Sequence, residues 1–166
     1  NNATGTAANH NFGNRWRRAT QFVLRNSIII GWPKGGLSLE SAATAKAFFV
    51  YNTSEFRNNL LHSNDAAAIY RTDAAALAIV TPAQMKTKAE AGGSVTLATA
   101  DAAMLTSPFY STAPNFLPKT GSPALTGVSF TGMNSYFVAT TFRGAMGTAD
   151  WTTGGWANWD PQNKAY

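Results

Sequence analysis

The sequence predicts a mainly β protein: a right-handed parallel β-helix, or solenoid, with short helical insertions and a Trp-rich C-terminal cap. A repeated phrase is the first observation behind this fold class. FVLRNSIIIGW at residues 22–32 and FRNNLLHSN at residues 56–64 both place Arg-Asn before a small polar residue and branched aliphatic residues. The copies lie thirty-two positions apart, a spacing that fits one coil of a solenoid carrying a modest insertion.

The asparagine in each copy has a specific place in such a coil. A tight corner needs a residue that tolerates the left-handed backbone region, and Asn does so at lower cost than most residues other than glycine. We therefore expect Asn26 and Asn58 at equivalent corners, with their amides in hydrogen-bond reach as a ladder, and Ile28 stacked over Leu60. Two unrelated hairpin strands with a chance similarity are the alternative.

The totals bound the class of protein. With 166 residues, 45% apolar and 13% charged, the chain is long enough for one domain with its own core. It has no cysteine, which excludes a disulfide-stapled module. The net charge of +5 could attract acidic glycans, lipid head groups or nucleic acid. Its one dense basic cluster, RWRR at residues 15–18, lacks any accompanying nucleic-acid motif, so we predict no nucleic-acid partner.

Composition divides the chain into four parts of one predicted domain. Residues 1–14 are polar and are expected to form a loop. Residues 15–64 carry the β-helix coils, and residues 65–106 form an excursion with short helices. Residues 107–166 hold the last coil and the cap. Such a short solenoid is predicted to be a fragment of a longer one.

Capping residues locate the helices. Ser41 is expected to cap a short helix in SAATAKAF, and Asp65 and Asp73 to begin helical turns in the two Asp-Ala-Ala-Ala phrases. The clearest helix is TPAQMKTKAEAGG. Thr81 is its expected N-cap, Pro82 takes the first helical position, and the Gly pair that follows ends it.

A resemblance adds to these patterns. PNFLPKTGSPALTG looks like the phrase that closes many secreted right-handed β-helix proteins. NSIIIGWPKGGL, FRNNLL, APNFLPKTGSPALTGVSF and TTFRGAMGTADWTTGGWANWDP occur in this order, as in the C-terminal portion of a family of uncharacterised secreted or surface β-helix proteins of Gram-negative bacteria. The resemblance covers residues 15–161. It implies the fold, a secreted or outer-membrane surface location and a longer precursor, but no activity.

Catalytic and metal-binding patterns are sparse. The aspartates are scattered, no Gly-His-Gly accompanies them, and a β-helix hydrolase would need them clustered. His10 and His62 are the only histidines, which makes a poor metal site. We predict no catalytic residue, no metal and no cofactor, and therefore a non-enzyme. The alternative is the C-terminal part of a polysaccharide lyase or hydrolase whose active site lies upstream.

Aromatic and basic residues are the candidate ligand contacts. Trp151, Trp156 and Trp159 could stack on sugar rings, or could cover the exposed end of the last coil. Arg25 and Arg57 could stack on one face. These residues predict a non-catalytic scaffold or binding module with a glycan as a candidate partner.

The N-terminal end of the predicted solenoid suggests a second kind of partner. Phe22, Leu24, Ile28 and Ile30 would face the core of an open coil and lie exposed, next to unpaired strand edges. We therefore expect upstream coils of the same precursor, a second copy or another surface protein to cover them. No apolar run is long enough for a transmembrane segment.

Overall fold

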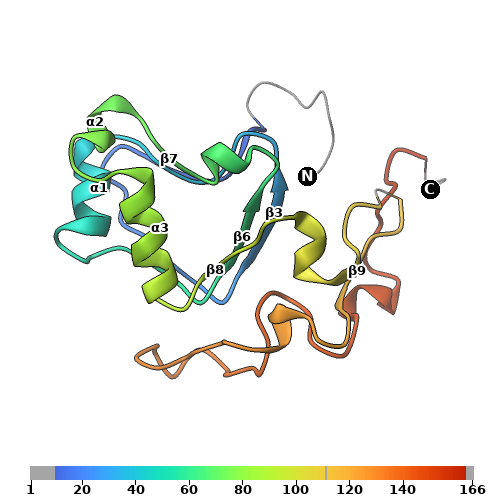
Figure 1. Ribbon diagram of the computed structural model, residues 1–166. Helices are drawn as coiled ribbons and strands as arrows, with labels where there is room; N and C mark the ends of the chain where they lie inside the picture. Colours follow the sequence, from blue (N-terminus) through green and yellow to red (C-terminus); the bar gives the residue numbers. More distant parts are fainter. Residues whose placement is uncertain (1–9, 111, 164–166) are drawn as a thin grey trace.

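The computed structural model describes residues 10–110 and 112–163, in which short strands alternate with three α-helices (Figure 1). The strands of this part form four sheets, ordered β1–β4–β7, β2–β5, β3–β6–β8 and β10–β9. Their bounds are β1 (Phe12–Trp16), β2 (Val23–Arg25), β3 (Ile28–Trp32), β4 (Gly35–Leu39), β5 (Glu55–Arg57), β6 (Leu60–Ser63), β7 (Tyr70–Thr72), β8 (Val95–Thr96), β9 (Leu105–Ser107) and β10 (Asn115–Pro118). The helices are α1 (Ala42–Phe49), α2 (Ala74–Leu77) and α3 (Pro82–Ala91).

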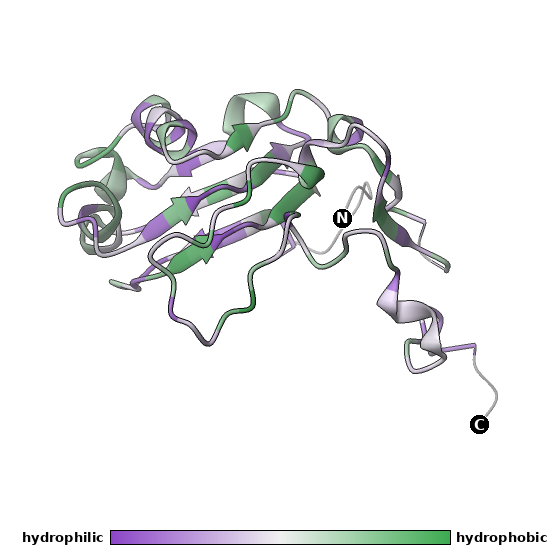
Figure 2. Cartoon of the chain, turned by 90° about the horizontal axis from the view of Figure 1, so that it is seen from below, coloured by the Kyte–Doolittle hydropathy of each residue, from purple (hydrophilic) through white to green (hydrophobic). Residues whose placement is uncertain are grey.

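The repeated phrase pairs with itself. β2 lies parallel to β5, and β3 lies parallel to β6, with Ile28 opposite Leu60. The register expected from the thirty-two-residue spacing is therefore confirmed for these two residues. β4 and β7 are also parallel, with Leu37 opposite Tyr70. Hydrophobic residues recur along several of the strands, while the C-terminal segment extends away from them (Figure 2).

The predicted β-helix is nevertheless wrong as the fold of this chain. It is a mixed fold, in which small sheets of two or three strands are joined to three helices. β9 and β10 are antiparallel, and no strand follows Pro118 in the part that the structure describes. The repeated phrase specifies a local parallel pairing. It does not specify further coils, because helix caps interrupt the chain after residue 64 and turns dominate it after residue 118.

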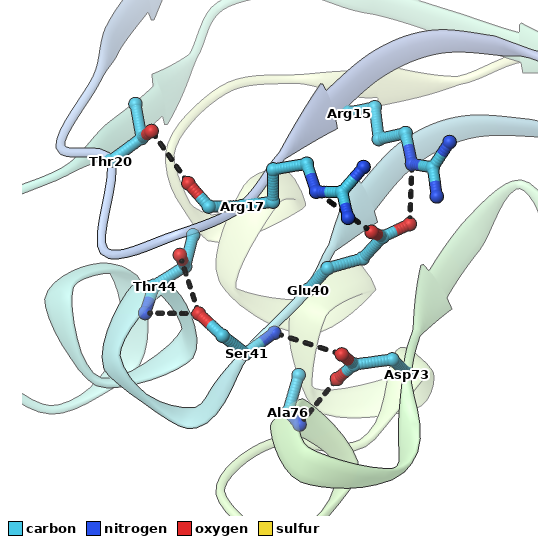
Figure 3. A network of polar contacts seen from close by, with 8 residues as sticks. All are labelled: Arg15, Arg17, Thr20, Glu40, Ser41, Thr44, Asp73 and Ala76. Carbon is cyan, nitrogen blue, oxygen red and sulfur yellow. Dashed lines mark hydrogen bonds and ion pairs between the residues drawn. The ribbon is translucent and has the colours of Figure 1, made fainter.

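The predicted helix caps are confirmed. The Ser41 side chain accepts from the Thr44 N–H, and Thr81 forms a capping box with Gln84 at the start of α3, which ends at Gly92. Asp73 caps α2 through the Ala76 N–H at 2.7 Å. Its other oxygen accepts from the Ser41 N–H at 3.0 Å (Figure 3). One carboxylate therefore ties the start of α2 to the start of α1.

A second contact in Figure 3 anchors β1 to the end of β4. Glu40 accepts from Arg15 Nε at 2.6 Å and forms an ion pair with Arg17 Nε at 3.6 Å. Two of the cations in RWRR are thus held by an internal carboxylate, whereas Arg18 lies exposed in a turn with a φ of 57°. Ion pairs at the protein surface add little to stability.

Two apolar clusters lie on opposite sides of the sheet that contains β3. The larger lies between the strands and the helices and is built around Leu37, Phe48, Phe56, Leu61 and Met85. The smaller joins β3 and β6 to β9 and to the 3₁₀ helices η2 (Ala100–Ala103) and η3 (Pro123–Leu125). The C-terminal half of the chain therefore covers the second face of this sheet.

That second cluster corrects the expected open N-terminal end. Ile30 is buried and Ile28 is partly buried, because β9, η2 and Gly144 pack beside them. Phe22 is also buried, with Trp16 stacked on its ring at a centroid distance of 4.4 Å. Leu24 is partly buried against the larger cluster. The chain therefore covers these side chains with its own residues, some earlier in the sequence and some later.

Residues 65–106, which we expected as an excursion, contribute strands to two of the sheets. β7 lies on β4, and β8 lies on β6 with Leu60 opposite Val95. Tyr70 and Leu97 from this stretch are buried. Its helices α2 and α3 cover the larger apolar cluster through Ala76, Met85 and Ala89.

Candidate ligand-binding sites

The two asparagines of the repeated phrase stand at equivalent corners. Asn26 and Asn58 have φ values of 54° and 56°, the left-handed conformation expected of them. Each lies one residue beyond a pair in register, Arg25 opposite Arg57. Gly93, with a φ of 80°, takes the third such corner, because the Asn58 N–H donates to the Gly92 carbonyl as the Asn26 N–H donates to Arg57.

The predicted amide ladder between these asparagines is wrong. Asn26 exchanges two hydrogen bonds with the backbone of Ser129, and Asn58 Nδ2 donates to the Gly127 carbonyl at 2.9 Å. Their side chains hold the later segment of the chain instead of each other. Asn59, one residue on, links neighbouring corners by accepting from the Ser27 N–H at 2.8 Å and donating to the Leu24 carbonyl at 3.0 Å.

Two of the three candidate tryptophans form a stacked pair. The Trp151 and Trp156 rings lie 5.2 Å apart between centroids and within 3° of parallel. Trp151 Nε1 donates to the Ala145 carbonyl, and Trp156 Nε1 donates to the Trp151 carbonyl. Asp150 caps the 3₁₀ helix η4 (Trp151–Gly154) that carries the pair. With their N–H groups satisfied and 52% and 65% of their surfaces exposed, the two indoles form a fixed aromatic surface, here called the indole pair.

The expectation of a tryptophan cap is corrected by these exposures. Both indoles of the pair have more than half of their surface exposed, so neither is buried as a cap over the core would be. Trp159 is separate from them and lies edge-on to Phe116 of β10, with a centroid distance of 5.7 Å. The structure therefore brings two of the three tryptophans together and leaves the third against the β9–β10 hairpin.

Arg25 and Arg57 are in register, as the sequence suggested, but they have different surroundings. Arg25 donates from Nε to Glu55 Oε2 at 2.7 Å and also from its terminal nitrogens to Glu55 and to the Thr131 carbonyl. Arg57 is exposed and lines a cleft of about 280 Å³ beside the end of α3. Only Arg57 is therefore placed to contact a ligand.

The same cleft contains a cation that sequence reasoning missed. Lys88, in the last turn of α3, donates to the Asn52 side chain and lies over the Phe48 ring at 5.3 Å. The remaining lining residues are Ser54, Glu55, Phe56, Ala91 and Gly92. Because Asn52 and Lys88 lie thirty-six residues apart, no local pattern joins them.

A second opening of about 310 Å³ lies beside the smaller apolar cluster. Ile28, Ile30 and Trp32 of β3 form one wall, and Leu105, Phe109 and Phe116 form the other. Residues 144–146 complete it. It is apolar and lacks a described charged side chain in its lining.

The carboxylates of the described chain have structural roles. Asp65, Asp73 and Asp150 accept hydrogen bonds at helix starts, while Glu40 and Glu55 form ion pairs with arginines. No group of three His, Cys, Asp or Glu side chains suited to a metal ion occurs among residues 10–110 and 112–163.

The two histidines have different surroundings. His62 is buried, and its Nδ1 accepts from the Gly31 N–H at 3.2 Å. Burial lowers the pKa of His62, and the nearby Asp101 charge partly opposes that shift. His10 is exposed at the start of the described chain.

Comparison of the chain with protein-family models, with curated proteins and with solved structures finds no match. Membership of the secreted or surface family that the chain resembles therefore stays a prediction, although the β-helix fold that the resemblance implied is wrong. Within the described part of the chain, none of the helices is long and apolar enough to cross a membrane.

Proposed function

We propose that the chain is a non-catalytic binding module of a secreted or surface protein, and that it holds a carbohydrate on the indole pair. The observation that carries this proposal is the stacking of Trp151 on Trp156 at the protein surface. Each indole uses one face for its partner, so its remaining exposed surface lies on the opposite face and along its edge. The apolar C–H face of a sugar ring packs on such a surface.

The hydrogen bonds of the pair support a binding role. Both indole N–H groups are satisfied by backbone carbonyls at 2.8 and 2.9 Å, so the rings are held before a ligand arrives. A side chain fixed in its binding geometry loses little conformational entropy on association. Exposing about half of two large aromatic rings to water has no stabilising effect on the fold, which favours a role in recognition.

The roles of the carboxylates support the non-catalytic part of the proposal. Glycoside hydrolysis uses two carboxylates on either side of the scissile bond. Glu55 is the one carboxylate in the cleft linings described above, and it is bound to Arg25. We expect no reducing sugar and no unsaturated product from pectin, alginate or similar polymers. Product release that is lost on substituting a single aspartate would overturn this part.

A glycan array followed by calorimetry tests the site. Residues 1–166 are screened against neutral and acidic oligosaccharides, and the best neutral oligosaccharide is titrated into the wild type, Trp156→Ala and Trp159→Phe. We expect Trp156→Ala to weaken binding roughly three- to tenfold, as the loss of one aromatic stacking contact does. Trp159→Phe is the matched control, because Trp159 lies outside the indole pair.

Two outcomes contradict the indole-pair site. One is the absence of binding to every neutral oligosaccharide on the array. The other is equal affinity of Trp156→Ala and Trp159→Phe for the oligosaccharide that the wild type binds. Circular dichroism and melting of each variant show whether a lost signal comes from the site or from the fold.

A further inference from the structure

The cleft between β5 and the end of α3 carries two cations without a matching acid. Arg57 lines it from β5, and Lys88 lines it from α3. Among the described residues the Arg57 guanidinium has no hydrogen bond or ion pair, and its N–H donors therefore face the solvent in the cleft. The stem of Arg57 packs on Gly92, where an added Cβ would lie 3.3 Å from Arg57 Cγ. This contact directs the side chain along the cleft wall.

Lys88 is held more firmly than an ordinary surface lysine. Its ammonium group lies 5.3 Å from the centre of the Phe48 ring and 5.9 Å from that of Phe49. One of its donors reaches the Asn52 side-chain oxygen. An ammonium group has three donors, so the others remain for a ligand. Cation–π contacts of this kind attract the ammonium group to this place.

The one carboxylate in the lining does not neutralise these cations. Glu55 is already paired with Arg25, which donates to it from two nitrogens on the side of β2. Glu90, the acidic residue near the end of α3, pairs instead with Lys86 at 3.9 Å. The cleft therefore presents two positive charges that no carboxylate of the described chain balances.

The end of α3 would normally repel an anion, because the last carbonyls of a helix point outward and carry partial negative charge. Here those carbonyls are occupied. Lys88 O and Ala89 O accept from the Gly92 N–H at 3.1 Å, and Glu90 O accepts from the Gly93 N–H at 2.9 Å. Ala89 O also accepts from the Ser94 N–H. The local field in the cleft is thus set by Arg57 and Lys88.

We infer that this cleft binds the carboxylate of an acidic sugar unit. The Arg57 guanidinium and the free donors of Lys88 would each donate charge-assisted hydrogen bonds to this carboxylate. At about 280 Å³ the cleft lies near the lower limit of ligand pockets, roughly 300 Å³, which fits one monosaccharide unit of a longer chain. Asn52 is exposed in this lining, where its oxygen accepts from Lys88 and one N–H donates to the Val50 carbonyl at 3.5 Å, so its second N–H remains for a sugar hydroxyl group.

The inference does not depend on the indole pair. The cleft lies by α1 and α3, while the segment that carries Trp151 and Trp156 lies at the other end of the molecule (Figure 1). That both sites hold one and the same glycan would rest on the proposed function. The variants below separate the two, because each removes one site and leaves the other.

The probe is an oligogalacturonate, with a neutral oligogalactoside of equal length and an oligoglutamate for comparison. Titration calorimetry at low salt compares the wild type with Arg57→Gln, Lys88→Gln and Lys86→Gln. Lys86→Gln is the matched control, because it removes the same charge from an exposed position of α3 outside the cleft. We expect Arg57→Gln and Lys88→Gln each to weaken oligogalacturonate binding by about tenfold or more, and Lys86→Gln to change it less than about twofold.

Each other outcome overturns the inference. If the wild type does not bind oligogalacturonate, or binds the neutral oligogalactoside equally well, the cleft does not recognise a sugar carboxylate. If Lys86→Gln and Arg57→Gln lose the same affinity for oligogalacturonate, binding depends only on the net charge of the protein. If oligoglutamate binds as tightly as oligogalacturonate, the cleft recognises a carboxylate but not a sugar. Loss of oligogalacturonate binding in Trp156→Ala, with Arg57→Gln unaffected, places the acidic ligand on the indole pair. Melting of every variant checks the fold.

Discussion

Asn58 Nδ2 lies 2.6 Å from the position that a Cβ atom on Gly93 would take, so it leaves no room for a side chain there. The two residues occupy equivalent corners of neighbouring chain segments, both with positive φ. Because the Asn58 amide fills the space above Gly93 and then reaches the Gly127 carbonyl, the third corner requires glycine rather than a further asparagine.

Gly93→Ala should therefore destabilise the protein for two separate reasons. A residue other than glycine costs about 1–2 kcal/mol in the left-handed region, and the added Cβ collides with the Asn58 amide. Gly132→Ala is the matched control, since Gly132 has a φ of 73° and nothing within 4 Å of an added Cβ. Urea unfolding should show a larger loss for Gly93→Ala, and equal losses would show that the Asn58 contact is unimportant.

Arg143 is expected to fasten the segment after η3 to the corners. It is only 3% exposed, and its Nη2 donates to the Gly93 carbonyl at 3.1 Å and the Gly127 carbonyl at 2.9 Å. Burial lowers the pKa of this guanidinium group, so removing it avoids the cost of burying a cation. We expect the loss of both hydrogen bonds to destabilise the segment by more than this. Arg143→Ala should increase amide hydrogen exchange at Ser129, whose N–H donates to Asn26.

Arg18→Ala is the control for that measurement, because Arg18 is exposed in a turn near β1. Exchange at Ser129 should be unchanged in this variant. Unchanged exchange in Arg143→Ala as well would mean that the Asn26 and Asn58 side chains hold the segment without help.

Sequence reasoning succeeded where the signal was local. Ser41, Asp73 and Thr81 are helix caps because each side chain bonds to a backbone N–H three residues later, a contact that a short stretch of sequence specifies by itself. The register of Ile28 with Leu60 also followed, since two copies of one phrase present the same alternation. These local features do not determine how many such units follow.

Contacts between distant residues decided the rest. The partner of Asn26 is Ser129, more than a hundred residues away, so an amide ladder with Asn58 looked sufficient from the repeat alone. The third corner at Gly93 was missed because glycine and asparagine share a backbone preference and no side-chain pattern. The cleft went unrecognised for a similar reason, since Lys88 meets Asn52 and Arg57 only through the packing of α3 on β5.

His62 should make stability depend on pH in the acidic range. Burial lowers its pKa in the folded chain below the ordinary value of 6.5, so the unfolded chain binds the proton more readily. Stability should be fully present above about pH 6.5 and fall as pH decreases through that value. A protonated Nδ1 also cannot accept the Gly31 N–H.

Urea unfolding between pH 5 and 8 measures this dependence. His62→Gln removes the titrating group and should flatten the curve, at some cost in stability at pH 8. His10→Gln, which removes an exposed histidine, is the comparison variant. A wild-type curve that is flat from pH 8 to 5 would show that the Asp101 charge offsets the burial of His62 completely.

Tyr70 should make stability depend on pH in the alkaline range, in the opposite direction. Burial raises the pKa of Tyr70 to about 12, compared with about 10 in the unfolded chain. The hydrogen bond between its hydroxyl and Thr96 Oγ1 at 3.0 Å lowers that pKa slightly, and the Glu90 charge raises it.

Between the pKa of the unfolded chain, about 10, and that of the folded chain, about 12, the unfolded chain loses the proton first. Stability should therefore be fully present below about pH 10 and decrease as pH rises to about 12. Absorbance near 295 nm should show a tyrosine ionisation near pH 12. Tyr70→Phe should remove that step and reduce the alkaline loss of stability, whereas Tyr136→Phe, at an 86% exposed position, should leave that step in place. A titration in which every tyrosine ionises together near pH 10 while the fold is intact would contradict the burial of Tyr70.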